Sequence, residues 1–337
     1  MDPRGEHLPL SWPLTNLNRL IFLLALVVIL TSIPGCKSVA WKARVLADKQ
    51  DHPSRIISDG SSVFYVTGGT VASRKEGTNN VNRISLKDGS VSVLVKGGEH
   101  LPSDTLAVDD KFVYWSVPGR IFRVPKAGGE SEMIVSDAPG KPDEMILDDE
   151  NIYWLVWGGS GSQSMPVLFA KKTGGSTQTL ATGQEGYSGL CVDRDFVYWV
   201  ATTGIRKAAK TGGPDTLVYR NPSRGPMSGM VQDSANLFYA QMDNRNDWVL
   251  MKISKQGGEA TKLAPSVSEV MQFVADENSV YYFDGETAST FALRKVSTNG
   301  GEPATLDRGE DSWNKYLAVD KSQVYFTTIA KVYVVAK

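Results

Sequence analysis

The stretch DDKFVYWSVPGRIFRVPKAGGE, residues 109–130, contains the features that decide the fold. It opens on an Asp, carries the aromatic pair Tyr114-Trp115 five residues later, and closes on a Gly-Gly pair before Glu130. The two runs between these landmarks are rich in β-branched and aromatic residues, which favour strands. The stretch therefore predicts two short strands, with an Asp turn before them and a tight glycine turn after them.

The same pattern recurs along the whole chain. An Asp followed five residues later by two aromatic residues occurs seven times, at Asp59, Asp109, Asp148, Asp193, Asp233, Asp276 and Asp320. Successive aspartates are 50, 39, 45, 40, 43 and 44 residues apart. A repeat of this length is typical of the blades of a β-propeller.

Each copy reads as four strands, because "TLAVD" precedes the Asp turn and "SEMIV" follows the glycine turn of the quoted stretch. Neighbouring residues of a strand point to opposite faces, so Tyr114 and Trp115 can both be buried only where the sheet is covered on both sides. A propeller blade meets that condition. The repeated Asp is expected to bind backbone amides of its own turn.

The two ends of the chain complement each other. The last copy stops at Lys337 without a fourth strand, and residues 41–50, "WKARVLADKQ", read as a free one. The prediction is all-β, a single seven-bladed propeller of four-stranded blades, closed by an N-terminal strand that pairs into the last blade. The propeller is expected over residues 41–337, with a closing strand and connector over 41–54 and blades over about 55–101, 102–141, 142–187, 188–227, 228–269, 270–313 and 314–337.

The N-terminus predicts export. Residues 20–33 form an apolar run of 14 residues, short for a spanning helix, and "IPGCKS" follows it. That motif resembles the bacterial lipobox, which implies a lipoprotein signal peptide over 1–35, lipid on Cys36 and a lipid-anchored linker over 36–40. Lys37 stands where inner-membrane lipoproteins carry Asp, so the resemblance implies the outer membrane of the cell envelope. A plain signal peptide and an uncleaved anchor are the alternatives.

The repeated "VYW" followed by "VPKAGGE" resembles the YWTD-type propellers, and more closely a group of bacterial secreted and lipoprotein propellers with repeats of the VYW...VPKxGGE type. The resemblance covers residues 41–337 and implies the fold but no ligand. "YWS", "YWL" and "YWV" replace Tyr-Trp-Thr-Asp, and seven copies differ from the six blades of the receptor propellers. What those receptors bind is therefore not carried over.

The composition gives no sign of a nucleic-acid partner, because 36 Lys and Arg balance 37 Asp and Glu. No catalytic motif and no metal-ligand spacing is found, so no cofactor and no metal are expected. Cys191, whose counterparts are small apolar residues, is expected to be a buried hydrophobe. The favoured function is a non-catalytic binding or assembly scaffold for a protein, peptide or glycan, tethered to a membrane. The alternative is a hydrolase or lyase with carboxylates at the central channel.

Recognition is expected where the copies differ. The loops joining second to third strands, and fourth strands to the next first strand, share one face of a propeller and vary here in length and composition. Variable loops on a rigid scaffold are common binding sites. The candidates are Arg74, Lys75, Trp157, Tyr187, Arg224, Arg245, Asp247, Trp248 and Trp313. For Trp157 and Trp248, packing on a neighbouring blade is the alternative.

Overall fold

The computed structural model describes residues 42–68, 79–97, 105–157, 165–184, 188–223, 225–267, 272–286, 290–310 and 316–337. The chain divides into two units, Met1–Ser38 and Val39–Lys337, and every described residue belongs to the second. Strands are the only regular secondary structure of these residues. None of the described segments is a helix long and apolar enough to span a membrane.

The strands of the closing segment and of blades 1 to 3 are β1 (Arg44–Ala47), β2 (Ser54–Ser58), β3 (Ser62–Thr67), β4 (Asn80–Ser85), β5 (Val91–Val95), β6 (Leu106–Val108), β7 (Phe112–Val117), β8 (Arg120–Pro125), β9 (Glu132–Val135), β10 (Lys141–Leu147), β11 (Asn151–Trp157), β12 (Met165–Lys171) and β13 (Gln178–Gln184). Those of blades 4 to 7 are β14 (Ser188–Val192), β15 (Phe196–Ala201), β16 (Gly204–Ala209), β17 (Thr216–Arg220), β18 (Met227–Gln232), β19 (Asn236–Met242), β20 (Trp248–Ser254), β21 (Thr261–Val267), β22 (Phe273–Ala275), β23 (Ser279–Gly285), β24 (Thr290–Ser297), β25 (Ala304–Glu310), β26 (Leu317–Val319), β27 (Gln323–Thr327) and β28 (Val332–Ala336).

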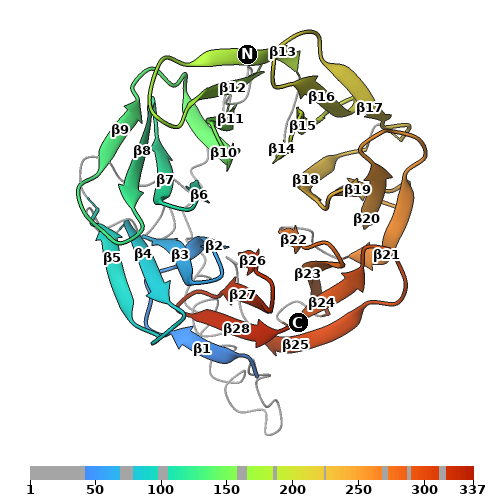
Figure 1. Ribbon diagram of the computed structural model, residues 1–337. Helices are drawn as coiled ribbons and strands as arrows, with labels where there is room; N and C mark the ends of the chain where they lie inside the picture. Colours follow the sequence, from blue (N-terminus) through green and yellow to red (C-terminus); the bar gives the residue numbers. More distant parts are fainter. Residues whose placement is uncertain are drawn as a thin grey trace, which may run out of the picture. The chain divides into compact units, whose positions relative to one another are not determined.

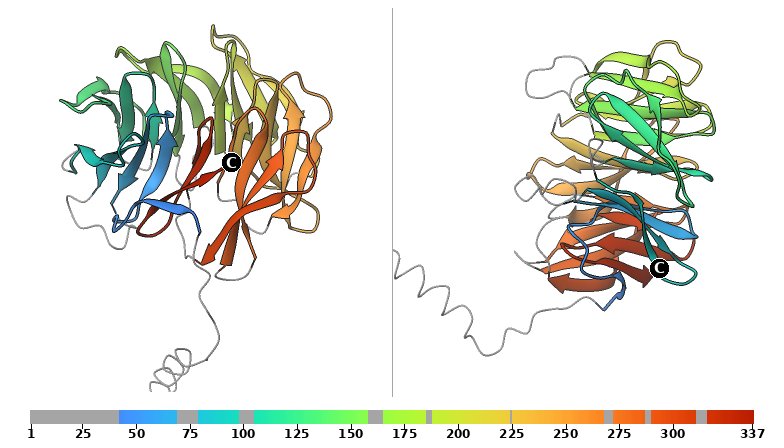
Figure 2. Two further views of the ribbon diagram at one scale, coloured as in Figure 1. Left: turned by 60° about the horizontal axis from the view of Figure 1, so that its bottom comes forward. Right: turned by 90° about the vertical axis from the view of Figure 1, so that its left-hand side faces the viewer.

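These strands form seven antiparallel four-stranded sheets arranged in a ring (Figure 1). The first strand of each blade lies nearest the axis and the fourth lies on the rim, and Figure 2 shows the blades from the side. Blade 7 takes its fourth strand from the other end of the chain, because β1 pairs with β28 through Arg44↔Val334, Val45↔Tyr333 and Ala47↔Val332. The predicted seven-bladed propeller and its closure by an N-terminal strand are confirmed.

Both rings of the aromatic pairs are buried, as predicted. Tyr114 and Trp115 are each 1% exposed. Tyr114 belongs to the apolar cluster that contains Trp154 of blade 3, whereas Trp115 belongs to the cluster that contains Phe64 of blade 1. The pair therefore joins its blade to the neighbours on both sides. Cys191 is also buried, 5% exposed, and burial raises the pKa of its thiol.

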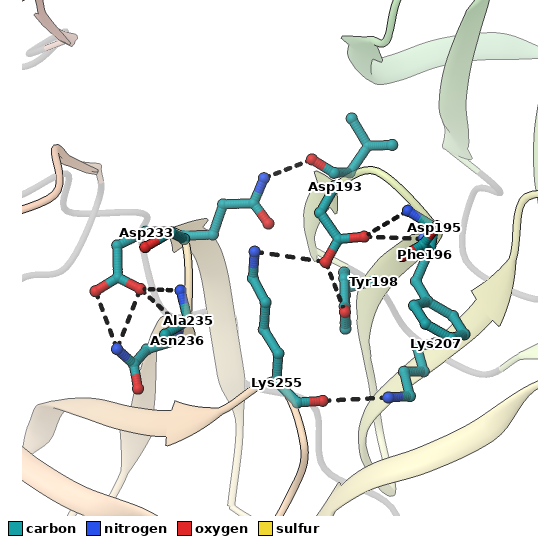
Figure 3. A network of polar contacts seen from close by, with 12 residues as sticks. Asp193, Asp195, Phe196, Tyr198, Lys207, Asp233, Ala235, Asn236 and Lys255 are labelled. Atoms are coloured by element: carbon teal, nitrogen blue, oxygen red, sulfur yellow. Dashed lines mark hydrogen bonds and ion pairs between the residues drawn. The ribbon is translucent and has the colours of Figure 1, made fainter.

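The repeated Asp binds its own turn, as predicted, and the structure adds two further bonds. Asp193 Oδ1 accepts backbone N–H groups of Asp195 and Phe196 at 3.0 and 2.9 Å (Figure 3). Its Oδ2 accepts the Tyr198 hydroxyl at 2.8 Å and lies 3.5 Å from Lys255 Nζ of blade 5. One carboxylate thus fixes a turn, a core tyrosine and the next blade.

The lysine contact recurs around the ring. The lysine directly follows the third strand of the next blade. In blades 2 to 5 it stands two residues before the first glycine of the turn, and in blade 7 it is Lys337. The described ion pairs of this kind are Lys126–Asp59, Lys172–Asp109, Lys210–Asp148, Lys255–Asp193 and Lys337–Asp276. We call them the blade clamps. They lie on the face that carries the Asp and Gly-Gly turns.

Asp233 shows what happens where both clamp partners are replaced. Phe238 stands at the tyrosine position and Thr298 at the lysine position, so these two positions supply no phenol and no ammonium group. Asn236 Nδ2 instead donates to both carboxylate oxygens of Asp233, at 3.1 and 3.0 Å. The carboxylate is thus satisfied without a lysine, and Ser234 of the same turn links that turn to blade 6 by donating to Glu277.

Candidate ligand-binding site

A cavity of about 370 Å³ lies at the axis of the ring. The first strands of all seven blades, or the residues that directly precede them, line it. The lining extends along these strands, from Arg55 and Thr105 to Ile57, Ile146 and Val231, which stand two residues before their Asp turns. The cavity therefore follows the inner strands of the ring along its axis.

One repeat position supplies most of the polar lining. The residue four places before each repeated Asp is here called the channel-mouth position. Its members are Arg55, Thr105, Glu144, Gly189, Gly229, Gln272 and Tyr316, and the first six line the cavity. The Asp position carries one residue type in all seven blades, whereas this position carries a cation, an anion, two glycines and three other polar types.

Residues at this position bind the neighbouring blade. Glu144 Oε2 accepts the backbone N–H of Gly189 at 2.7 Å, and Oε1 accepts that of Leu190 at 3.0 Å. The Thr105 hydroxyl donates to the carbonyl oxygen of Pro142 at 3.2 Å. These contacts hold the first strands of blades 2, 3 and 4 together, so the rim of the cavity is rigidly built.

Glycine at this position permits a special backbone. Gly189 and Gly229 have φ values of +88° and +59°, and the ladder to the second strand shifts register at both places. A Cβ at Gly189 would lie 2.6 Å from Met230 Cβ, and one at Gly229 would lie 2.9 Å from the Phe273 ring. Both glycines therefore mark bulges at which the next blade approaches closely.

Arg55 adopts a similar backbone without being a glycine. Its φ is +43°, and β2 shifts register between Ser54 and Ile57. A residue with a Cβ is strained there by about 1–2 kcal/mol. Its guanidinium lies over the Tyr316 ring, with 5.6 Å from Cζ to the ring centroid, and its Nε is buried without a hydrogen-bond partner in the described structure. Strain combined with an unsatisfied donor is a pattern found at functional sites.

The candidates predicted from the loops lie elsewhere or outside the described residues. Arg245 and Asp247 are exposed in the turn between β19 and β20, where both backbone N–H groups bind Asp243 Oδ1, and neither lines the cavity. Trp248 is half-buried and packs on the apolar cluster shared by blades 5 and 6. This is the packing on a neighbouring blade that was given above as the alternative to binding. The backbone of Trp157 pairs with Lys141 in blade 3. The side chain of Trp157 lies outside the described part, as do Cys36, Arg74, Lys75, Tyr187, Arg224 and Trp313, and these stay predictions.

Sequence reasoning missed Arg55 and Glu144 because it searched loops, whereas these residues stand in strands. A usable signal was present in the repeats. Aligning the seven copies on their Asp places glycine at two channel-mouth positions and five different side chains at the others. A glycine inside a strand suggests a bulge, so this column marks a special backbone at the axis.

The described lining of the cavity carries Arg55 as its single cation and Glu144 as its single carboxylate. Glycoside hydrolysis needs two carboxyl groups facing one bond. Within the described residues, no group of three or more His, Cys, Asp or Glu is placed to hold a metal ion. The described arrangement is a small cavity with a mixed apolar and polar lining, in which Arg55 and Glu144 carry the charges.

Comparison with known proteins supports the fold alone. No protein-family model matches the chain, and no curated protein matches it in sequence. Among solved structures, it is similar to U3-55K, with a TM-score of 0.63, 12% identity, and 87% of this chain and 98% of that chain covered. The propeller domain of the Trilobed protease from Pyrococcus furiosus gives a TM-score of 0.61 and 12% identity, with 86% and 94% covered.

A chain of a nidogen/laminin complex is similar over 65% of this chain and 86% of that one, with 19% identity and a TM-score of 0.50. At these identities, the similarity shows a shared fold and says nothing about a ligand. The Pyrococcus propeller is described as having an open velcro topology. The present ring differs, because β1 closes blade 7.

Proposed function

We propose that the protein is a non-catalytic binding scaffold of the bacterial cell envelope that holds its ligand at the channel mouth. The observation that carries the proposal is the channel-mouth position, which lines one cavity with unlike side chains while the blade clamps repeat. Arg55 retains a strained backbone at a place where two other blades use glycine. A binding role explains why that strain is kept, because binding sites often sacrifice stability for function.

The proposal includes attachment to a membrane through lipid on Cys36. The apolar run of residues 20–33 and the lipobox-like "IPGCKS" support it, together with the likeness of the repeats to bacterial lipoprotein propellers. The ligand is a protein, peptide or glycan of the envelope. Mass spectrometry of the mature protein distinguishes a lipid-modified Cys36 at its N-terminus from an unmodified chain, and the second result would remove the anchor from the proposal.

Blocking the cavity tests the binding role. Ser228 lines the cavity, so Ser228→Trp should fill much of it with an indole ring. Ser92→Trp is the matched control, because Ser92 is exposed on β5 at the rim. We expect the immobilised full-length protein and the Ser92→Trp variant to capture the same envelope component, and the Ser228→Trp variant to lose it.

Capture that is identical for all three proteins would contradict a ligand site at the channel mouth. Circular dichroism of the Ser228→Trp variant checks that the fold is intact. The mass of the captured ligand separates the two candidate functions, because a binding protein returns its ligand unchanged. A ligand that gains the mass of water or is cleaved would favour the hydrolase or lyase instead.

A further inference from the structure

The two charged groups of the cavity differ in how far their hydrogen bonds are satisfied. Both carboxylate oxygens of Glu144 accept backbone N–H groups of blade 4, so this charge is engaged by the scaffold. Arg55 Nε is buried and has no acceptor among the described residues, and the guanidinium rests over Tyr316. Of these two charged groups, Arg55 is therefore the one whose Nε donor is engaged by no acceptor of the described residues.

We infer that the channel-mouth cavity binds a small carboxylate-bearing molecule, or a carboxylate-bearing end group, whose carboxylate pairs with Arg55. This inference rests on the proposed binding function and specifies its ligand. A guanidinium presents planar donors that match the two oxygens of a carboxylate. A cavity of about 370 Å³ has room for a group of about the size of one sugar acid or one amino-acid residue.

The charge of the lining selects a carboxylate over a phosphate. Arg55 is the single cation of the described lining, and Glu144 contributes a negative charge to the same cavity. One guanidinium balances a single negative charge. A phosphate close to two negative charges would leave charge uncompensated beside Glu144, which is costly in a partly desolvated site.

The inference can be tested at Arg55 itself. We would record the arginine Nε–Hε NMR correlations of the full-length protein and assign the Arg55 signal as the one lost in Arg55→Lys. Titration with sodium acetate and with sodium glucuronate should move this signal saturably, in the millimolar range typical of small fragments. Glucose, the neutral counterpart of glucuronate, and sodium chloride at equal ionic strength should not move it.

Arg194 is the internal control, since it is exposed in the Asp turn of blade 4 on the opposite face. Its signal should follow ionic strength only. In Arg55→Gln, the affinity for glucuronate, measured on neighbouring backbone amides, should fall at least about tenfold. The ratio of the glucuronate and acetate affinities reports whether the sugar ring adds contacts to those of the carboxylate.

Two results would overturn the inference. One is an Arg55 signal that fails to saturate with either carboxylate, and the other is inorganic phosphate binding at least as tightly as both. A failure of the proposed function can be distinguished from a failure of this inference. If Ser228→Trp abolishes ligand capture while Arg55 ignores carboxylates, the site stands and its ligand chemistry is wrong. If Arg55 binds carboxylates while capture survives Ser228→Trp, the envelope ligand binds elsewhere.

Discussion

Removing residues 41–50 is expected to lower the free energy of unfolding by about 3–5 kcal/mol, as much as truncating one large core side chain. The deletion takes β1 from blade 7 and exposes the edge of β28, where Val332 and Val334 are 0% and 4% exposed. It also removes the two N–H donors, of Lys42 and Ala43, that bind Asp307 at 3.1 and 2.7 Å. Asp307 is 5% exposed, so its carboxylate would be left buried with fewer hydrogen bonds.

Urea unfolding followed by tryptophan fluorescence measures this loss. Val45→Thr is the control, because Val45 is 39% exposed and its substitution leaves the pairing of β1 with β28 in place. We expect the control to unfold within a few tenths of a kcal/mol of the natural chain. An unchanged midpoint in the deletion variant would show that ring closure by this segment contributes nothing to stability.

The second large effect is a loss of stability in acid. Burial alone raises the pKa of Asp59 and Asp109, but lysine contacts and turn hydrogen bonds outweigh it and lower each pKa to about 2. Hydrogen bonds, joined by lysine contacts at the first three, likewise outweigh burial and lower the pKa at four further positions, Asp148, Asp193, Asp276 and Asp320. An aspartate in the unfolded chain titrates near pH 4. The unfolded state therefore binds these protons first as the pH falls.

The sign of the effect follows from linkage. The stabilisation by each carboxylate is complete above the unfolded pKa and is lost as the pH falls through the folded pKa. After a discount for solvent screening, Asp59 and Asp109 should each contribute about 1 kcal/mol, and the other four carboxylates should add to the loss in the same direction. Urea unfolding between pH 5 and pH 2 should show this decline.

Asp193→Asn should make the acid decline shallower, because one linked proton is removed. Asp195→Asn is the matched control from the same turn, where Asp195 is exposed and donates only its backbone N–H to Asp193. A stability that is flat from pH 5 to pH 2 in the natural chain would contradict the structural role of the blade clamps.

Much of the fold could be predicted because it repeats. Seven copies of one pattern reveal the blades, the Asp turns and the glycine turns, and the missing fourth strand at Lys337 predicts the closure by residues 41–50. The blade clamps were missed for a physical reason. A lysine such as Lys255 beside a glycine turn looks like an ordinary solvated charge until the neighbouring blade places Asp193 near it.

The candidate site was harder to predict because its residues do not stand in loops. Closing the ring brings Arg55 of blade 1 over Tyr316 of blade 7, and the packing of consecutive blades places Glu144 of blade 3 on the amides of blade 4. The first strands also carry bulges at this position, where the pairing of β2 with β3 and of β10 with β11 shifts register. In the sequence, Gly189 and Gly229 indicate bulges at the same position of blades 4 and 5.

We infer that Arg55 occupies a glycine-type backbone position for the sake of binding. A comparison of Arg55→Gly with Arg55→Ala tests this role most directly. Glycine relieves the left-handed strain, whereas alanine retains it. We therefore expect Arg55→Gly to be more stable than Arg55→Ala by about 1 kcal/mol in urea unfolding, the reverse of the usual order. Both variants should lose the expected millimolar binding of glucuronate, as measured on neighbouring backbone amides. An alanine variant at least as stable as the glycine variant, or glucuronate binding retained in both, would contradict the claim.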